Sequence, residues 1–176
     1  MNYILRGVGV LATVGVVSLF AFSLPHGGEA RGDGGENLLP RVTHRAWQQE
    51  CGSCHLAYPP SLLPRASWRE MMGGLDRHFG EDASLDPVTQ ADILKFLETH
   101  AADSGASRVG ARVMQRSNGQ APQRITETRW FVRKHDEVAP DVWKRKSVGS
   151  PANCAACHRQ AEKGLFDDDS VRIPRP

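Results

Sequence analysis

The chain has 176 residues, of which 40% are hydrophobic, 24% charged and 7% aromatic, and its formal net charge is +2. This composition is typical of a globular protein and excludes a wholly disordered chain. The small charge also excludes the basic surface that nucleic-acid binding requires. Large apolar side chains are few, so a large hydrophobic core made of protein alone is not expected. A bulky apolar cofactor would supply part of the core.

The first 23 residues predict export. Arg6 precedes an uncharged run at residues 7–24, which is the pattern of a secretory signal peptide, and the small residues Ala21 and Ser23 offer a cleavage site. The run is also close to the length of a bilayer span, so a retained membrane anchor is the alternative. In either case the body of the protein is predicted to be exported. Residues 24–36, which follow the apolar run, are Gly-rich and predicted to be flexible.

All the cysteines of the chain fall in two C-x-x-C pairs, each followed by a histidine: Cys51, Cys54 and His55, then Cys154, Cys157 and His158. Three interpretations compete, namely a redox-active disulfide in each pair, one zinc ion bound by both pairs, and covalent attachment of haem. A redox-active pair usually lies in a βαβ pattern, which neither cluster shows. A zinc site leaves both histidines without a role.

Haem attachment explains the whole motif. Two thiols one helical turn apart can each form a thioether with one of the two vinyl groups on the same porphyrin edge, and the next residue can bind the iron. The residues between the cysteines, 52–53 and 155–156, are all small and let the porphyrin approach. The motifs therefore predict two covalently bound haem c groups, with His55 and His158 as the proximal iron ligands.

The second axial ligand of each iron decides its chemistry. An iron with protein ligands on both faces of the haem is closed and favours electron transfer, whereas an iron with one free face is open and permits ligand binding or catalysis. Five histidines remain: His26, His44, His78, His100 and His135. His26 directly follows the signal segment and His44 precedes the first motif on the proximal side, so neither is favoured. His100 ends a helix that Asp86 begins as N-cap, where a histidine also interacts with the helix dipole, and it stays a competitor.

The sequence favours His78 and His135 as distal ligands. A helix expected to begin with Ser67 as its N-cap carries His78 on its apolar stripe. His135 follows Phe131 and Val132 by four and three residues, so one helical turn places all three on the same face. The alternatives are a histidine of the protein core in the first case and a surface histidine in the second.

The expected fold class is mainly α, with two small helical cytochrome-c-like lobes, long loops and one haem in each lobe. Residues 37–103 form the N-terminal haem lobe, residues 104–124 a linker with a short helix, and residues 125–176 the C-terminal haem lobe. In the last of these, Ser150 and Pro151 are expected to begin a helix just before the second motif.

Four blocks of residues 45–176 are similar to a known family: ECGSCHLAYPPSLLPRASWREMM, LDRHFGEDASLD, RITETRWFVRKH and NCAACHRQAEKGLFDDDSVRIP. The chain resembles the periplasmic dihaem cytochromes c of phototrophic and other Gram-negative bacteria. This resemblance implies two low-spin haems with two histidine ligands each. It assigns Cys51, Cys54, His55 and His78 to one haem and Cys154, Cys157, His158 and His135 to the other. An exchange of the distal ligands between the haems is the alternative.

The resemblance further implies a periplasmic electron carrier without enzymatic activity. Its implied partners are redox proteins, namely a small oxygen-binding monohaem cytochrome c as acceptor and a membrane cytochrome as donor. The competing function is a dihaem redox enzyme of peroxidase type, or a reductase subunit, with one open haem site. The chain is short for such an enzyme and offers a histidine to both distal faces, which favours the carrier.

Overall fold

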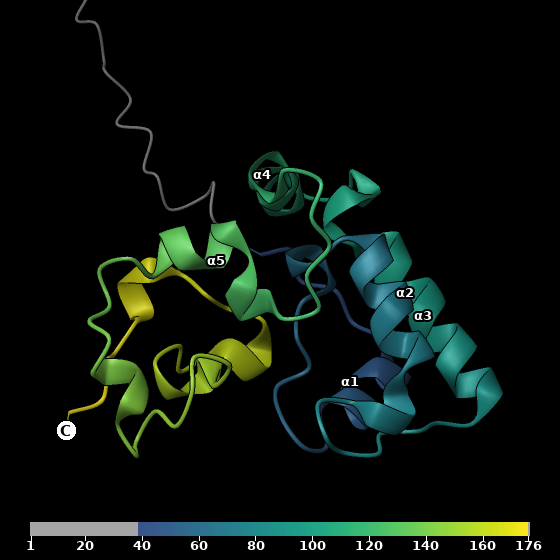
Figure 1. Ribbon diagram of the computed structural model, residues 1–176, viewed down its shortest axis with the longest axis horizontal. Coiled ribbons are helices and arrows are strands. Elements are labelled where there is room, and N and C mark those ends of the chain that lie inside the picture. The colour runs from purple at the N-terminus through teal and green to yellow at the C-terminus, as the bar shows by residue number, and fades with distance from the viewer. Residues whose placement is uncertain (1–38, 176) are drawn as a thin grey trace, which may run out of the picture. The chain divides into compact units, whose positions relative to one another are not determined.

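The computed structural model describes residues 39–175 (Figure 1). The predicted signal peptide or anchor, the Gly-rich segment and His26 lie outside this range. Within it the chain is helical, and the only β-pairing consists of two isolated bridges, which confirms the mainly α class. The same residues include no helix long and apolar enough to cross a membrane.

The described part of the chain contains five α-helices: α1 (Arg45–Cys51), α2 (Arg65–Gly73), α3 (Pro87–His100), α4 (Arg108–Ser117) and α5 (Arg129–Lys134). Short 3-10 helices lie in the connections between and after them: Pro60–Leu62, Leu75–Arg77, Ala102–Ser104, Ile125–Glu127, Val142–Lys144, Cys154–Ala156, Ala161–Lys163 and Asp168–Ser170. The second motif therefore lies in a region that holds only 3-10 helices and loops.

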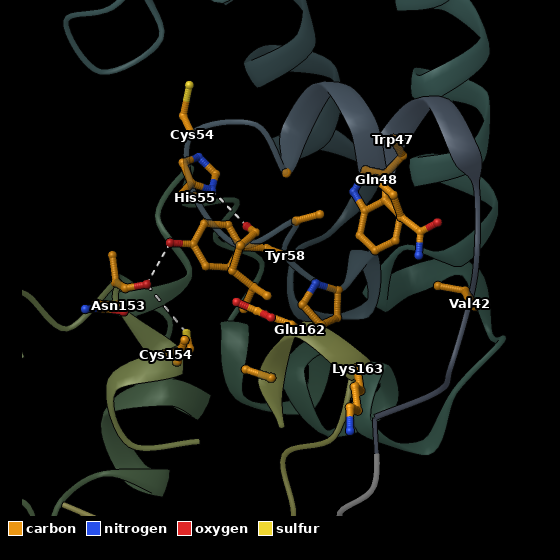
Figure 2. A pocket seen from close by; sticks show the side chains of 18 of the residues that line it. Val42, Trp47, Gln48, Cys54, His55, Tyr58, Asn153, Cys154, Glu162 and Lys163 are labelled. Carbon is orange, nitrogen blue, oxygen red and sulfur yellow. Dashed lines mark hydrogen bonds between the residues drawn. The ribbon is translucent and has the colours of Figure 1, made fainter. Parts of the chain in front are cut away.

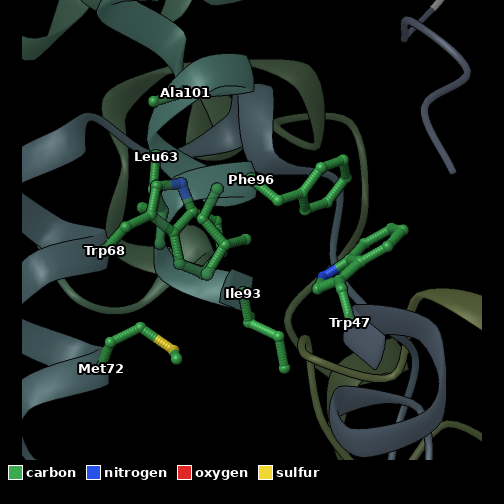
Figure 3. Packing of buried hydrophobic residues seen from close by; sticks show 8 residues of the cluster. Trp47, Leu63, Trp68, Met72, Ile93, Phe96 and Ala101 are labelled. Carbon is green, nitrogen blue, oxygen red and sulfur yellow. The ribbon is translucent and has the colours of Figure 1, made fainter. Parts of the chain in front are cut away.

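The first core cluster lies among α1, α2 and α3, of which α2 and α3 run side by side (Figure 1). Its members are buried side chains, shown in Figure 3: Trp47, Leu63, Trp68, Met72, Ile93, Phe96, Leu97 and Ala101. The start of α3 is as predicted, since the carboxylate of Asp86 accepts hydrogen bonds from the backbone N–H groups of Val88 and Thr89. This cluster holds the helix that carries the first motif against the rest of the fold.

A second core cluster forms around α4, the short helix expected in the linker. It contains Leu39, Leu62, Ala102, Val109 and Val113, and Trp130 and Phe166 pack against it. Ser107 is the N-cap of this helix, and its hydroxyl accepts a hydrogen bond from the N–H of Gly110. The cluster and the residues packed against it thus come from positions 39 to 166, which include parts of both predicted haem lobes. The boundaries of these lobes stay a prediction.

The helix expected to begin at Ser67, carry His78 and close at Gly80 is wrong at both ends. Helix α2 begins after the extended Pro64, so Ser67 lies inside the first turn, where it is buried and makes no capping bond. The helix ends at Gly73 because two consecutive glycines, of which Gly74 is the C-cap, are poor helix formers. His78 therefore follows the helix instead of lying on its apolar stripe.

The α-helix expected after Ser150 and Pro151 is also absent from the described residues. The hydroxyl of Ser150 accepts a hydrogen bond from the N–H of Ala152, which closes a local turn instead of capping a helix. A 3-10 helix then spans Cys154–Ala156, with Asn153 preceding it.

Candidate haem sites

The first motif begins at the end of α1. Cys51 is the last residue of that helix, and the N–H of Gly52 donates to the carbonyl of Gln48 as the helix terminates. A Cβ at Gly52 would lie only 2.2 Å from this carbonyl oxygen, so the tight exit from the helix requires glycine. Cys54 and His55 follow in the exposed turn.

His78 lies next to His55 in space. Their ring centroids are 6.1 Å apart and the ring planes meet at 24°. His78 caps the 3-10 helix Leu75–Arg77 and starts a tight turn in which Phe79 takes a left-handed conformation, with φ of 52°. The guanidinium of Arg124 lies 4.0 Å from the centre of the Phe79 ring, a cation–π contact that supports this turn.

The second motif is held by the C-terminal segment of the chain. The N–H of His158 donates to the carbonyl of Cys154 at 2.9 Å, which turns the histidine back over the motif. The N–H of Arg172 donates to the carbonyl of Cys157 at 3.0 Å, and Val171 forms an isolated β-bridge with His158. The ring of Phe166 packs against His158 with centroids 5.4 Å apart.

His135 lies next to His158, with ring centroids 6.2 Å apart and planes at 79°. Helix α5, capped by the hydroxyl of Thr128, ends just before His135. Phe131 packs on the His135 ring at 4.0 Å, as the helical spacing predicts, whereas Val132 is 58% exposed. Val132 is thus open to solvent and does not share the packing that Phe131 provides to the ring.

Both histidine pairs leave the space that one iron requires. Two metal–nitrogen bonds of about 2 Å each, plus roughly 1 Å from each nitrogen to its ring centre, place the centres of two axial imidazoles about 6 Å apart. The observed separations are 6.1 and 6.2 Å. The donor set of each site, two thiols and two imidazoles, also matches covalent haem attachment with two axial histidines. The residues present thus fit a haem in each site.

Hydrogen bonds to backbone carbonyls orient two of these rings. The Nδ1 of His55 lies 2.8 Å from the carbonyl oxygen of Leu56, and the Nδ1 of His135 lies 2.9 Å from that of Phe131. An Nδ1–H that donates to a carbonyl leaves Nε2 unprotonated and available to a metal.

The other two rings are held in their neutral form. Burial lowers the pKa of His78, with further contributions from His55 and Arg124. Burial also lowers the pKa of His158, and the neighbouring His135 adds to the effect. Among the described atoms, the buried Nδ1 of His158 has no hydrogen-bond partner. Both rings are therefore neutral at neutral pH, as metal ligation requires.

The cysteines do not fit the two competing interpretations. No disulfide joins any of the four, all of which lie in the described range. Burial raises the pKa of Cys51 and of Cys154 to about 11, whereas a redox-active C-x-x-C lowers the pKa of its attacking thiol. Within residues 39–175, no cluster of three or more His, Cys, Asp or Glu side chains can hold a metal ion, so a single zinc site is not formed.

The remaining described histidines are engaged elsewhere. His44 is the N-cap of α1, where its Nδ1 accepts the N–H of Trp47 and its Nε2 lies 3.1 Å from the carboxylate of Asp92. The Nδ1 of His100 lies 3.0 Å from the carbonyl of Phe96, and its ring stays against that phenylalanine. The structure thus brings His78 and His135 to the motif histidines. His44 and His100 do not lie beside them.

A phenol links the two sites. The ring of Tyr58 lies against His55, and its hydroxyl donates to the carbonyl of Ala152, beside the second motif (Figure 2). Burial raises the pKa of Tyr58 to about 12, so the phenol stays protonated. The sequence places Tyr58 near the first haem because it follows His55 closely. No sequence signal indicates its bond to the second motif.

Comparison with known proteins decides the family. The profile of the dihaem cytochrome c family matches residues 47–166. The chain belongs to the dihaem cytochrome c family. It accordingly carries two covalently bound haem c groups, and electron transfer is the function that its family implies. The curated proteins include no match to the chain.

Solved dihaem cytochromes c share the fold. The diheme cytochrome c from Rhodobacter sphaeroides is 45% identical, with a TM-score of 0.64, over 71% of this chain and 98% of that one. A new diheme cytochrome type c from Shewanella baltica OS155 is 43% identical, with a TM-score of 0.61, over 74% and 92% of the two chains. The chain therefore spans nearly the full length of both relatives.

Proposed function

We propose that the protein is a periplasmic electron carrier whose two haem irons are each closed by two histidines. One iron takes His55 and His78, and the other takes His158 and His135. The thioether bonds form at the cysteines of the two motifs: Cys51, Cys54, Cys154 and Cys157. The observation that carries the proposal is the separation of the two histidine pairs, 6.1 and 6.2 Å, since each matches two imidazoles on opposite sides of one iron.

Closed irons suit a carrier. When bound, each haem supplies a site that takes up and releases one electron. Two histidine ligands keep the iron six-coordinate in both oxidation states, so little rearranges on electron transfer. The protein orients the imidazoles through the carbonyls of Leu56 and Phe131 and keeps His78 and His158 neutral by burial. These residues support fast exchange and offer no open iron to a substrate.

The proposed partners are redox proteins. A small monohaem cytochrome c is the acceptor and a membrane cytochrome the donor, as expected for an exported dihaem carrier. The apolar N-terminal run supports export, with a cleaved signal peptide or a retained anchor as the two outcomes. Mass spectrometry of the mature protein distinguishes these outcomes by its N-terminal residue.

Stopped-flow kinetics tests the proposal. The reduced holoprotein is mixed with a small ferric monohaem cytochrome c, and separately with hydrogen peroxide under steady reductant supply. We expect reduction of the cytochrome and no catalytic consumption of peroxide. Sustained peroxide turnover without reduction of the cytochrome would support the dihaem enzyme instead.

A further inference from the structure

Tyr58 is in contact with both haem sites. Its ring centroid lies 4.9 Å from that of His55, with the planes at 27°. Its hydroxyl donates a hydrogen bond of 2.7 Å to the carbonyl of Ala152, which is 94 positions away in the chain. One side chain therefore packs on an iron ligand proposed for the first site and bonds to the loop of the second.

The acceptor of this bond is itself tied to the second motif. The carbonyl of Ala152 also accepts the backbone N–H of Cys154 at 3.0 Å, and the Sγ of the same residue lies 3.6 Å from it. The N–H of Ala152 donates to the hydroxyl of Ser150, which fixes the peptide from its other side. The Tyr58 hydroxyl thus bonds to a hydrogen-bonded turn whose carbonyl contacts the first cysteine of the second motif.

Both motifs meet at the pocket in which Tyr58 lies. The pocket has a volume of about 900 Å³, and its lining includes Cys54, His55 and Tyr58 from one segment and Asn153 and Cys154 from the other. Figure 2 shows the phenol lying between His55 and the turn before Cys154, with its hydroxyl directed to that turn. Tyr58 therefore spans the space between the two attachment sites.

We propose that Tyr58 is a positioning residue that fixes the ring of His55 and holds the Cys154 turn against it, and so sets the coupling between the two haem sites. This inference rests on the proposed function, in which each haem takes up and releases one electron, and adds that the electron passes from one haem to the other. One ferrous iron is oxidised and the other, ferric, iron is reduced by that single electron. The phenol is neither oxidised nor deprotonated, so no further reactant is required.

Two variants separate the contributions of the ring and the hydroxyl. Tyr58→Phe keeps the ring against His55 and removes the bond to Ala152, whereas Tyr58→Leu removes both. Thr99→Val is the matched control, because it also removes a 2.7 Å bond from a hydroxyl to a carbonyl, within the exposed part of α3 and outside the pocket lining.

The measurements are the rate of electron exchange between the haems after flash reduction, the two reduction potentials, and the electron paramagnetic resonance spectrum. In Tyr58→Phe we expect two attached low-spin haems, a changed separation of the potentials and a lower exchange rate, since the bond that holds the Cys154 turn to Tyr58 is lost. In Tyr58→Leu the spectrum of the His55 haem shifts as well. Thr99→Val leaves all three unchanged.

Unchanged rate and potentials in Tyr58→Phe would overturn the inference, and this variant decides the matter even if Tyr58→Leu fails to mature. A loss of folding stability that is equal in the two oxidation states moves neither potential. The wild-type spectrum separates this inference from the proposed function. If the wild type has two low-spin haems and Tyr58→Phe has unchanged rate and potentials, only the role of Tyr58 is overturned. A high-spin haem in the wild type overturns both this role and the proposed function.

Discussion

Phe131 holds the imidazole of His135 in two ways. Its ring packs on the imidazole with centroids 4.0 Å apart and planes at 23°, and its carbonyl oxygen lies 2.9 Å from Nδ1. The first contact fixes the position of the ring, and an Nδ1–H that donates to the carbonyl leaves Nε2 unprotonated. The end of α5 therefore holds the ring beside His158, as the proposed ligation requires.

Replacing His135 tests its proposed role as an axial ligand. In His135→Gly we expect one haem to become high-spin and reactive with carbon monoxide, because the iron loses its distal imidazole, while both haems stay covalently attached. Visible absorption and intact mass report these two properties. His100→Gly is the control and should keep both haems low-spin. A variant at position 135 with an unperturbed low-spin spectrum would show that another residue is the ligand.

The two pairs of imidazoles differ in the angle between their planes. His55 and His78 are closer to parallel, at 24°, and His135 and His158 are nearly perpendicular, at 79°. Axial ligand orientation sets the splitting of the iron d orbitals, so we expect two distinct low-spin signals from the oxidised protein in electron paramagnetic resonance. The more anisotropic signal belongs to the perpendicular pair. A single signal that accounts for both haems would contradict this geometry.

Gly52 tests the path of the chain through the first motif. In Gly52→Ala the new Cβ meets the carbonyl of Gln48, so the backbone must shift, at a cost of about 1–3 kcal/mol in folding free energy. We expect a lower yield of protein with both haems attached, measured by mass spectrometry. Gly73→Ala is the control, because its new Cβ meets nothing within 4 Å beyond its chain neighbours and the backbone of its own helix. Equal yields from the two variants would refute the steric argument.

Leu63 tests the core that holds the first motif. It is fully buried in the first core cluster, so we expect Leu63→Ala to lower the free energy of unfolding by about 2–5 kcal/mol. Chemical denaturation of the holoprotein measures this change. Val88→Ala, at a position that is 78% exposed, should change the stability by no more than about 0.5 kcal/mol. A similar effect at both positions would show that the cluster does not carry the stability.

The sequence was most informative where chemistry restricts the residue types. The spacing of cysteines and histidines predicted two haems, and the family comparison confirms them. The sequence favours His78 and His135 for the helical faces expected to carry them, and the face expected for His78 does not form because α2 ends at Gly73. The structure places both beside the motif histidines, and their ligation stays a proposal. The N-cap at Asp86 is predicted correctly because it depends on neighbouring residues alone.

Predictions from local sequence patterns were wrong or incomplete where helix-breaking residues or contacts between distant residues determine the structure. The apolar spacing predicts a helix that continues from Ser67 through His78. It takes no account of the low helix propensity of Gly73 and Gly74, which end α2. The bond from Tyr58 to Ala152 joins residues 94 positions apart, and no periodicity or spacing predicts such a contact. Relations between the two motifs therefore require the folded structure.

The central claim is that both irons are closed by histidine. The most direct test is the visible absorption spectrum of the purified holoprotein, oxidised and reduced, with and without carbon monoxide. We predict two low-spin haems whose spectra carbon monoxide does not change. A high-spin band, or a shift of the reduced spectrum on adding carbon monoxide, would show that one distal face is open and would contradict the assignment of His78 or His135.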